Sequence, residues 1–136
     1  MQTLANAMDV GNPSNFERMQ WLYGRDLDAM RRDITGSRHT DDEVRETIRR
    51  VFETRGYLLD PHSAIGYMGL AGQVGRDGRD GIFLATAHPA KFAEIVEPII
   101  GRAIEKPRPL ADALARPRHV LTLDPTLVAV KGALGA

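Results

Sequence analysis

The first hydrophobic pattern of the chain predicts an amphipathic helix over about residues 16–32. Apolar side chains recur there at spacings of three and four: Phe16, Met19, Tyr23, Leu27 and Met30. Ser14 or Asn15 is placed to cap the start of this helix, and Glu17 in its first turn complements the helix dipole. The turn-forming residues before it therefore mark the end of a loop over residues 1–15.

A second helix is predicted from Thr40 to about Arg55. Thr40 and Glu43 have the spacing of a capping box, and Gly56 stands where a helix commonly ends. The apolar face of this helix is made of Val44, Ile48, Val51 and Phe52. Its arginines are interpreted as a solvated face, because no turn-and-recognition-helix pattern for DNA accompanies them.

A third helix is predicted over about residues 61–73, with Asp60 as its cap and Pro61 at its first position. Most of its side chains are apolar, so we expect it to be buried. Gly66, Gly69 and Gly72 recur every three residues, and each lowers helix propensity by about 1 kcal/mol relative to alanine. The spacing suggests close approach of another backbone or of a ligand.

A buried strand is predicted over about residues 82–87, followed by a helix from Pro89 to about Arg102. Thr86 and His88 then lie at the carboxyl end of a strand, where open α/β sheets bind their ligands. The alternative is that Thr86 is an ordinary strand threonine and His88 a partly buried cap. The pattern of residues leaves both interpretations open.

The remainder of the chain predicts a proline-bearing linker at 106–109, a short helix at 110–115, a strand at 119–123 and a last helix at 126–134 that follows Asp124-Pro125. Strands and helices together predict a helix-rich α/β fold with few strands.

The composition excludes several classes of function. The 136 residues contain 18 basic and 18 acidic side chains, so no overall charge favours nucleic acid or an anionic membrane. The absence of cysteine excludes disulfides, thiolate metal sites and a cysteine nucleophile. The four histidines are too scattered for a metal motif, and we expect no metal site. With neither a signal peptide nor an apolar run long enough to span a bilayer, we expect a soluble, cytoplasmic protein.

The loop before residue 16 is a candidate anion site. Asn12, Ser14, Asn15 and Arg18 cluster at the predicted helix start, and helix N-termini bind phosphate through free N–H groups. The alternative is that these residues only cap the helix.

Three blocks together resemble threonine synthase, in the order of that family. They are MDVGNPSNFER at residues 8–18, LDPHSAIG at 59–66 and TAHPAKF at 86–92. The departures are small, because Ser63 and Ile65 stand where threonine and valine are usual and Ala85 where serine is usual. The resemblance is to the C-terminal portion of the family, which is of the tryptophan-synthase-β-like fold type II.

The resemblance implies a reaction that uses pyridoxal 5'-phosphate (PLP) to convert O-phospho-L-homoserine and water to L-threonine and phosphate. The Schiff-base lysine and the loop that binds the cofactor phosphate belong to the family's N-terminal portion. Lys91, Lys106 and Lys131 lack the context of that lysine, so no catalytic residue is assigned here. We expect the chain alone to be inactive and to hold no covalently bound PLP.

By resemblance, Thr86 meets the pyridine nitrogen of PLP, with Ala85 and His88 as neighbouring candidates. His62 and His88 are candidates near the site or in support of it. The four residues of the candidate anion site are assigned more weakly to the substrate or to domain closure.

The whole chain is therefore interpreted as one C-terminal segment. It comprises the loop 1–15, a helical region 16–55, a helix–strand–helix region near the cofactor at 57–104 and tail helices at 105–136. We expect it not to be a self-sufficient domain, to pair with the N-terminal part of the same enzyme and to self-associate through exposed apolar surface. The alternatives are a non-catalytic regulatory or scaffold module, and a subunit that completes a split PLP enzyme in trans.

Overall fold

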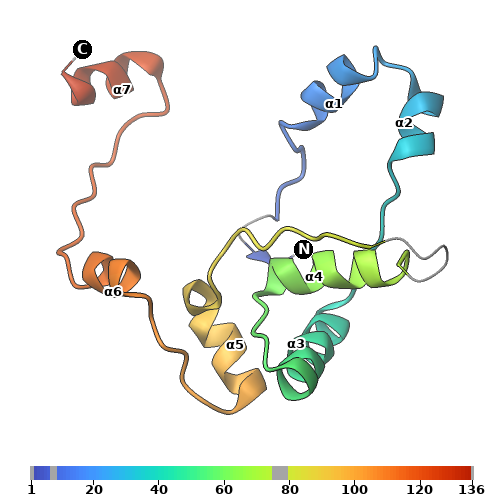
Figure 1. Ribbon diagram of the computed structural model, residues 1–136. Helices are drawn as coiled ribbons and strands as arrows, with labels where there is room; N and C mark the ends of the chain where they lie inside the picture. Colours follow the sequence, from blue (N-terminus) through green and yellow to red (C-terminus); the bar gives the residue numbers. More distant parts are fainter. Residues whose placement is uncertain (1, 7–8, 75–79, 136) are drawn as a thin grey trace. The chain divides into compact units, whose positions relative to one another are not determined.

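A computed structural model describes residues 2–6, 9–74 and 80–135, and all regular structure in these ranges is helical (Figure 1). The chain divides into two compact units, Met1–Glu105 and Lys106–Ala136. In order, the helices are α1 (Phe16–Leu22), α2 (Leu27–Asp33), α3 (Asp41–Arg55), α4 (Pro61–Ala71), the 3₁₀-helix η2 (Pro89–Phe92), α5 (Ala93–Ile100), α6 (Arg108–Leu114) and α7 (Leu127–Leu134).

The predicted single helix over 16–32 is wrong, because two helices, α1 and α2, occupy that region. Gly24 and Arg25 between them have φ angles of 57° and 63°, in the left-handed region that interrupts an α-helix. The carboxylate of Asp26 then caps α2 by accepting hydrogen bonds from the amides of Asp28 and Ala29 at 2.9 and 3.0 Å. The left-handed turn at Gly24 and Arg25 therefore separates α1 from α2, and the Asp26 cap begins α2.

The core of the first unit forms where α3 packs against both α4 and α5 (Figure 1). Its buried apolar residues are Val44, Ile48, Val51, Leu59, Ala64, Phe92 and Val96. The prediction of α3 is confirmed at both ends. Thr40 and Glu43 form the capping box, and Gly56 ends the helix with a φ of 65°.

Helix α4 is confirmed at its start, where Asp60 is the cap and Pro61 the first residue, and it ends at Ala71 rather than at residue 73. Full burial of this helix was a wrong expectation, because only its first turn is buried. A Cβ at Gly66 would lie 4.0 Å from the Phe83 side chain, which is ordinary van der Waals contact. The close neighbour of this glycine is therefore a side chain of the chain itself.

The predicted strand over 82–87 is not formed, and neither is the one over 119–123. The first of these segments is extended, and Phe83 packs on Tyr67 of α4 with ring centroids 5.9 Å apart. Its neighbours Ile82 and Leu84 are 88% and 78% exposed. A strand needs a second strand for its hydrogen bonds, and the described residues offer no partner to this segment. The strands of the predicted α/β fold are therefore absent from the described residues.

The helix predicted from Pro89 begins there, but as the 3₁₀-helix η2, and α5 follows it and ends at Ile100. Gly101, with a φ of 69°, terminates α5. Because residue 102 lies beyond this glycine, the predicted end was two residues too late.

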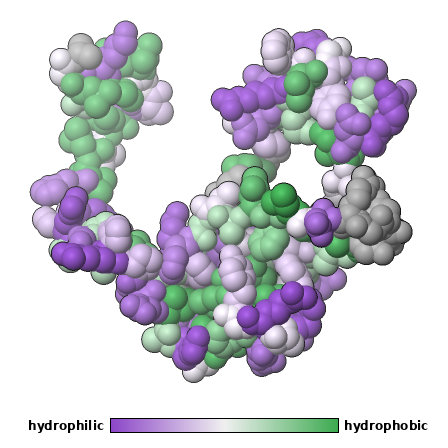
Figure 2. Space-filling view, in the orientation of Figure 1, coloured by the Kyte–Doolittle hydropathy of each residue, from purple (hydrophilic) through white to green (hydrophobic). Residues whose placement is uncertain are grey.

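The second unit contains α6 and α7, and neither helix has a buried residue. Helix α6 begins at Arg108, two residues before the predicted start. Helix α7 is capped by the Thr126 hydroxyl, which accepts a hydrogen bond from the Ala129 amide at 3.2 Å, rather than by Asp124. Figure 2 shows hydrophobic residues gathered on α7 and on the segment leading to it.

Candidate functional site

Thr86 is exposed near the end of the extended segment 82–87, three residues before η2 begins. Its neighbour Ala85 is also exposed. Because the hydroxyl is neutral at all ordinary pH values and both donates and accepts hydrogen bonds, it can face either form of a nitrogen base. The segment presents this hydroxyl immediately before a fixed turn.

His88 fixes that turn by capping η2. Its Nδ1 accepts a hydrogen bond from the Ala90 amide at 3.1 Å, and Pro89 occupies the first helical position. A ring nitrogen that accepts a hydrogen bond carries no proton, so the proton of the neutral ring is on Nε2. The capping interpretation of His88 is confirmed, although the residue is exposed rather than partly buried.

Behind the turn, the ring of His62 packs on that of Phe92, with centroids 5.3 Å apart and planes at 59°. Phe92 is buried in the core cluster. The start of α4 holds His62 in place, because the buried Asp60 carboxylate accepts hydrogen bonds from the His62 amide at 2.9 Å and from the Ser63 amide and hydroxyl. Asp60 is thus a structural cap, as the sequence indicates.

Two aspartates hold the N-terminal segment: Asp9 bonds within the segment itself, and Asp41 joins it to α3. The Asp9 carboxylate accepts hydrogen bonds from the Thr3 amide and hydroxyl, both at 2.7 Å. These bonds lower the pKa of Asp9, and the charge of His62 lowers it further as a minor cause. The Leu4 amide donates to Asp41 of α3 at 3.2 Å. The first sequence block begins at Met8, outside the described residues, and from Asp9 onward it follows this anchored segment.

The candidate anion residues Asn12, Ser14, Asn15 and Arg18 are all exposed. Asn15 occupies the cap position of α1, but its backbone is helical and its side chain makes no capping hydrogen bond. The predicted side-chain cap is therefore wrong for Asn15. The backbone of Asn15 takes its place, because the Arg18 amide donates to the Asn15 carbonyl at 3.1 Å.

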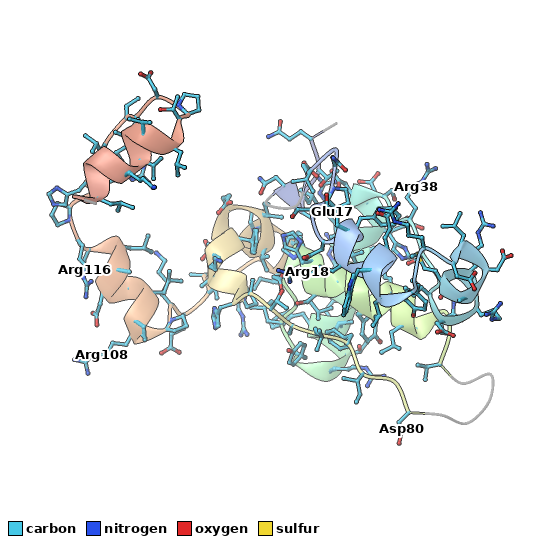
Figure 3. The ribbon with its side chains drawn as sticks, turned by 90° about the horizontal axis from the view of Figure 1, so that it is seen from above. Glu17, Arg18, Arg38, Asp80, Arg108 and Arg116 are labelled. Atoms are coloured by element: carbon cyan, nitrogen blue, oxygen red, sulfur yellow. The ribbon has the colours of Figure 1, made fainter. Side chains whose placement is uncertain are left out.

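Arg18 lines an open cavity of about 470 Å³ on α1, together with Glu17, Trp21 and Leu22. Figure 3 labels Arg18 and Glu17. The lining is mostly apolar, and Glu17 is an acidic residue in it. The sequence prediction missed this cavity. The signal available in the sequence was that Trp21 and Leu22 are large apolar residues outside the predicted apolar face. In the structure both are exposed.

The site residues thus form two groups. Ala85, Thr86 and His88 lie together at the turn before η2, and the four anion candidates lie at the start of α1. Within the described ranges 9–74 and 80–135, no hydrogen bond joins one group to the other, and no cluster of three His, Asp or Glu side chains could hold a metal ion. No helix in those ranges is both long enough and apolar enough to cross a bilayer.

The family model described as "Threonine synthase, C-terminal" matches residues 63–134. The chain is 39% identical to a threonine synthase of Escherichia coli (strain K12) over 110 residues, which are 81% of this chain and 25% of that protein. It is 41% identical to a threonine synthase of Haemophilus influenzae over 108 residues, or 79% of this chain and 25% of the relative.

Solved structures give the same result. The crystal structure of threonine synthase from Escherichia coli matches with a TM-score of 0.81 and 34% identity, covering 98% of this chain and 30% of that one. A PLP-bound threonine synthase from Brucella melitensis matches with a TM-score of 0.73 and 33% identity, covering 98% and 34%. The chain therefore spans about a quarter of the length of the curated relatives and about a third of the solved chains.

Proposed function

The chain belongs to the threonine synthase family, and we propose that it forms the C-terminal wall of the PLP site in a fold type II enzyme. That enzyme is a lyase of threonine biosynthesis, which converts O-phospho-L-homoserine and water to L-threonine and phosphate. The observation that carries the proposal is the similarity of fold over 98% of this chain, combined with an exposed Thr86 in the third sequence block.

The residues of this chain fit a contact with one edge of PLP, but they do not fit the Schiff-base lysine and the phosphate-binding loop that hold the cofactor. Thr86 offers an exposed neutral hydroxyl, and the turn that follows it is fixed by His88 and Pro89. Lys91 is exposed on η2 and lacks the sequence context of the cofactor lysine. When bound, PLP supplies the electron sink that allows protons to leave the substrate's carbon atoms. The N-terminal part of the enzyme therefore has to supply the Schiff-base lysine and the phosphate-binding loop.

Thr86 orients the ring by donating its hydroxyl hydrogen bond to the pyridine nitrogen. A carboxylate at this place would stabilise a protonated nitrogen, whereas a hydroxyl favours the unprotonated, accepting nitrogen. Ala85 leaves space next to the hydroxyl because it carries only a methyl group. His88 acts indirectly, by capping the turn that sets the direction of Thr86.

The N-terminal part of the enzyme is the proposed partner of the extended segment. Ile82 and Leu84 are large, exposed and on the same side of the chain, since side chains alternate along extended backbone and Phe83 faces α4. Within the part of the chain that the structure describes, no strand pairs with the backbone beside them. A strand of the partner would pair with this backbone and cover both side chains.

This pairing is tested by binding to the N-terminal portion of the Escherichia coli enzyme. The double variant Ile82→Asp/Leu84→Asp is expected to weaken binding at least about tenfold, because it would bury two unpaired charges. The matched control is Leu127→Asp/Val128→Asp in α7, which makes the same change at exposed apolar residues of the second unit. Equal losses in both variants, or self-association of the wild-type chain in place of binding, would contradict the pairing.

Arg18 is the proposed contact of this chain with the substrate phosphate. A guanidinium binds phosphate with two hydrogen bonds, and Arg18 lines an open cavity. In the assembled enzyme, meaning this chain with the N-terminal portion, Arg18→Ala is expected to raise KM for O-phospho-L-homoserine at least about tenfold, which is the loss of roughly 1.4 kcal/mol. Gln20→Ala, on the same helix, is the control. An unchanged KM in Arg18→Ala would remove the assignment.

The proposed function as a whole is tested by phosphate release. The chain is mixed with the N-terminal portion of the Escherichia coli enzyme, and phosphate and threonine are measured with O-phospho-L-homoserine as substrate. We expect activity in the mixture and none in either part alone. A mixture that binds both PLP and the N-terminal portion without releasing phosphate would support a scaffold or regulatory role instead.

A further inference from the structure

His62 joins two of the three sequence blocks. It belongs to the block at 59–66, and its ring packs on Phe92 of the block at 86–92. These two residues are 30 positions apart in the chain. The fold therefore brings the two blocks together at one side chain.

The contact of His62 with Phe92 has favourable geometry. A centroid separation of 5.3 Å and an angle of 59° lie in the range of favourable aromatic pairs. Phe92 is the last residue of η2, and both it and Ala90 are buried. Because η2 is a single short turn, the ring of Phe92 is one of its two buried attachments to the core.

His62 itself has little freedom. The Asp60 carboxylate accepts the His62 amide, and the same carboxylate is bonded to Ser63, so the backbone at the start of α4 is fixed. Both Asp60 and Ser63 are nearly fully buried. The imidazole ring is half-buried and extends from this fixed point onto η2.

From this arrangement we propose that His62 is a positioning residue for Thr86. Its ring, held by the Asp60 cap, supports Phe92 and thereby holds η2 and the His88 turn in the position that directs the Thr86 hydroxyl. The inference rests on the proposed role of Thr86, and it assigns His62 no contact with substrate or cofactor.

We therefore expect kcat to depend on an aromatic ring at position 62 and not on the basicity of that ring. His62→Phe keeps an aromatic partner for Phe92, whereas His62→Ala removes it. In the assembled enzyme, His62→Ala is expected to lower kcat about tenfold to a hundredfold with a smaller change in KM, because misplaced reacting groups slow the chemical step. His62→Phe is expected to stay within about threefold of wild type in kcat.

A second measurement separates positioning from a general loss of structure. If His62 acts through Thr86, the losses in kcat from His62→Ala and Thr86→Val are not additive in the double variant. Ile65→Ala, a half-buried core contact on the same helix, is the control and should add to Thr86→Val. Additive losses for His62→Ala, or failure of His62→Phe to restore kcat, would overturn the proposal.

A third measurement does not depend on activity. In the full chain, His62→Ala is expected to speed hydrogen exchange of the Ala90 amide, which is bonded to His88, at least about tenfold, whereas His62→Phe leaves it unchanged. If the assembled enzyme released no phosphate, the proposed function would be contradicted. Hydrogen exchange of the Ala90 amide would still test whether His62 holds η2 in position. Equal exchange in His62→Ala and wild type would overturn that role.

Discussion

The two units of the chain use similar apolar residues to different effect. In the first unit, Val44, Ile48 and Val96 are at most 2% exposed, because α3, α4 and α5 bring their apolar faces together. In the second unit, Leu127 and Val128 are 71% and 82% exposed. Apolar composition alone therefore does not make a core, and a second helix face has to be present to cover it.

The second unit depends on local hydrogen bonds for its helices. Helix α7 has the Thr126 cap at its start and Gly135 at its end, and it spans eight residues. Isolated helices of this length are marginal in water, because nucleation costs more than a few hydrogen bonds return. We therefore expect α7 to be marginal on its own.

The largest expected effect is in the first unit. Ile48→Ala should lower the free energy of unfolding by about 2–5 kcal/mol, because it leaves a cavity in the core. Val128→Ala in α7 should change it by less than about 0.5 kcal/mol. Urea unfolding followed by circular dichroism measures both. Comparable losses from the two variants in the isolated chain would show that α7 is packed.

The next effect concerns the start of α4. Asp60→Ala removes the acceptor of three hydrogen bonds at a buried position and should cost about 1–3 kcal/mol. The control is Asp26→Ala, which removes the exposed cap of α2 and should cost about 1 kcal/mol or less. An equal loss in both variants would contradict the importance assigned to burial at Asp60.

A smaller, pH-dependent effect is expected at the start of α3. The Thr40 amide and hydroxyl, 2.6 and 2.9 Å from the Glu43 carboxylate, lower the pKa of Glu43 below its ordinary 4.5. The folded state therefore favours the charged form, so this stabilisation is present above pH 4.5 and is lost as the pH falls through the lowered folded value. In urea unfolding between pH 6 and about 3, the free energy of unfolding should fall less steeply with decreasing pH in Glu43→Gln than in wild type. Identical slopes would contradict the capping role of the carboxylate.

The smallest effect is expected for the ion pairs on the α3 surface. Arg45 and Asp42 are 2.9 Å apart, with Asp42 almost fully exposed. Exposed pairs of this kind contribute about 0.5 kcal/mol or less, so Asp42→Asn should hardly move the urea midpoint. A loss above about 1 kcal/mol would show that this face is covered in the folded chain.

Features set by neighbouring residues were predicted from the sequence. The Thr40–Glu43 box and the Asp60-Pro61 start each depend on three or four residues and are present as expected. The His88 cap is also present and was one of the two interpretations left open for that residue. The break at Gly24 and Arg25 was missed, because the apolar spacing continues across it. The cap of α7 was misplaced from Thr126 to Asp124 because both residues are good caps two positions apart.

Features that need distant partners could not be predicted in this way. The apolar run at 82–84 has strand propensity, but a strand exists only when a second one pairs with it, and none of the described residues does. Thr86 is a candidate by its place at the end of the predicted strand, which does not form, and only the resemblance of whole blocks assigns it a role. The packing of His62 on Phe92 joins residues 30 apart, and no spacing rule connects them.

The central claim is that this chain contributes the Thr86 hydroxyl to the PLP site. The most direct measurement compares Thr86→Val with Thr86→Ser in the assembled enzyme, recording phosphate release and the absorption spectrum of bound PLP across pH. Thr86→Val should lose at least about tenfold in kcat and shift the spectral pH profile, while Thr86→Ser stays within about threefold. A Thr86→Val enzyme with the kcat and the pH profile of wild type would contradict the account.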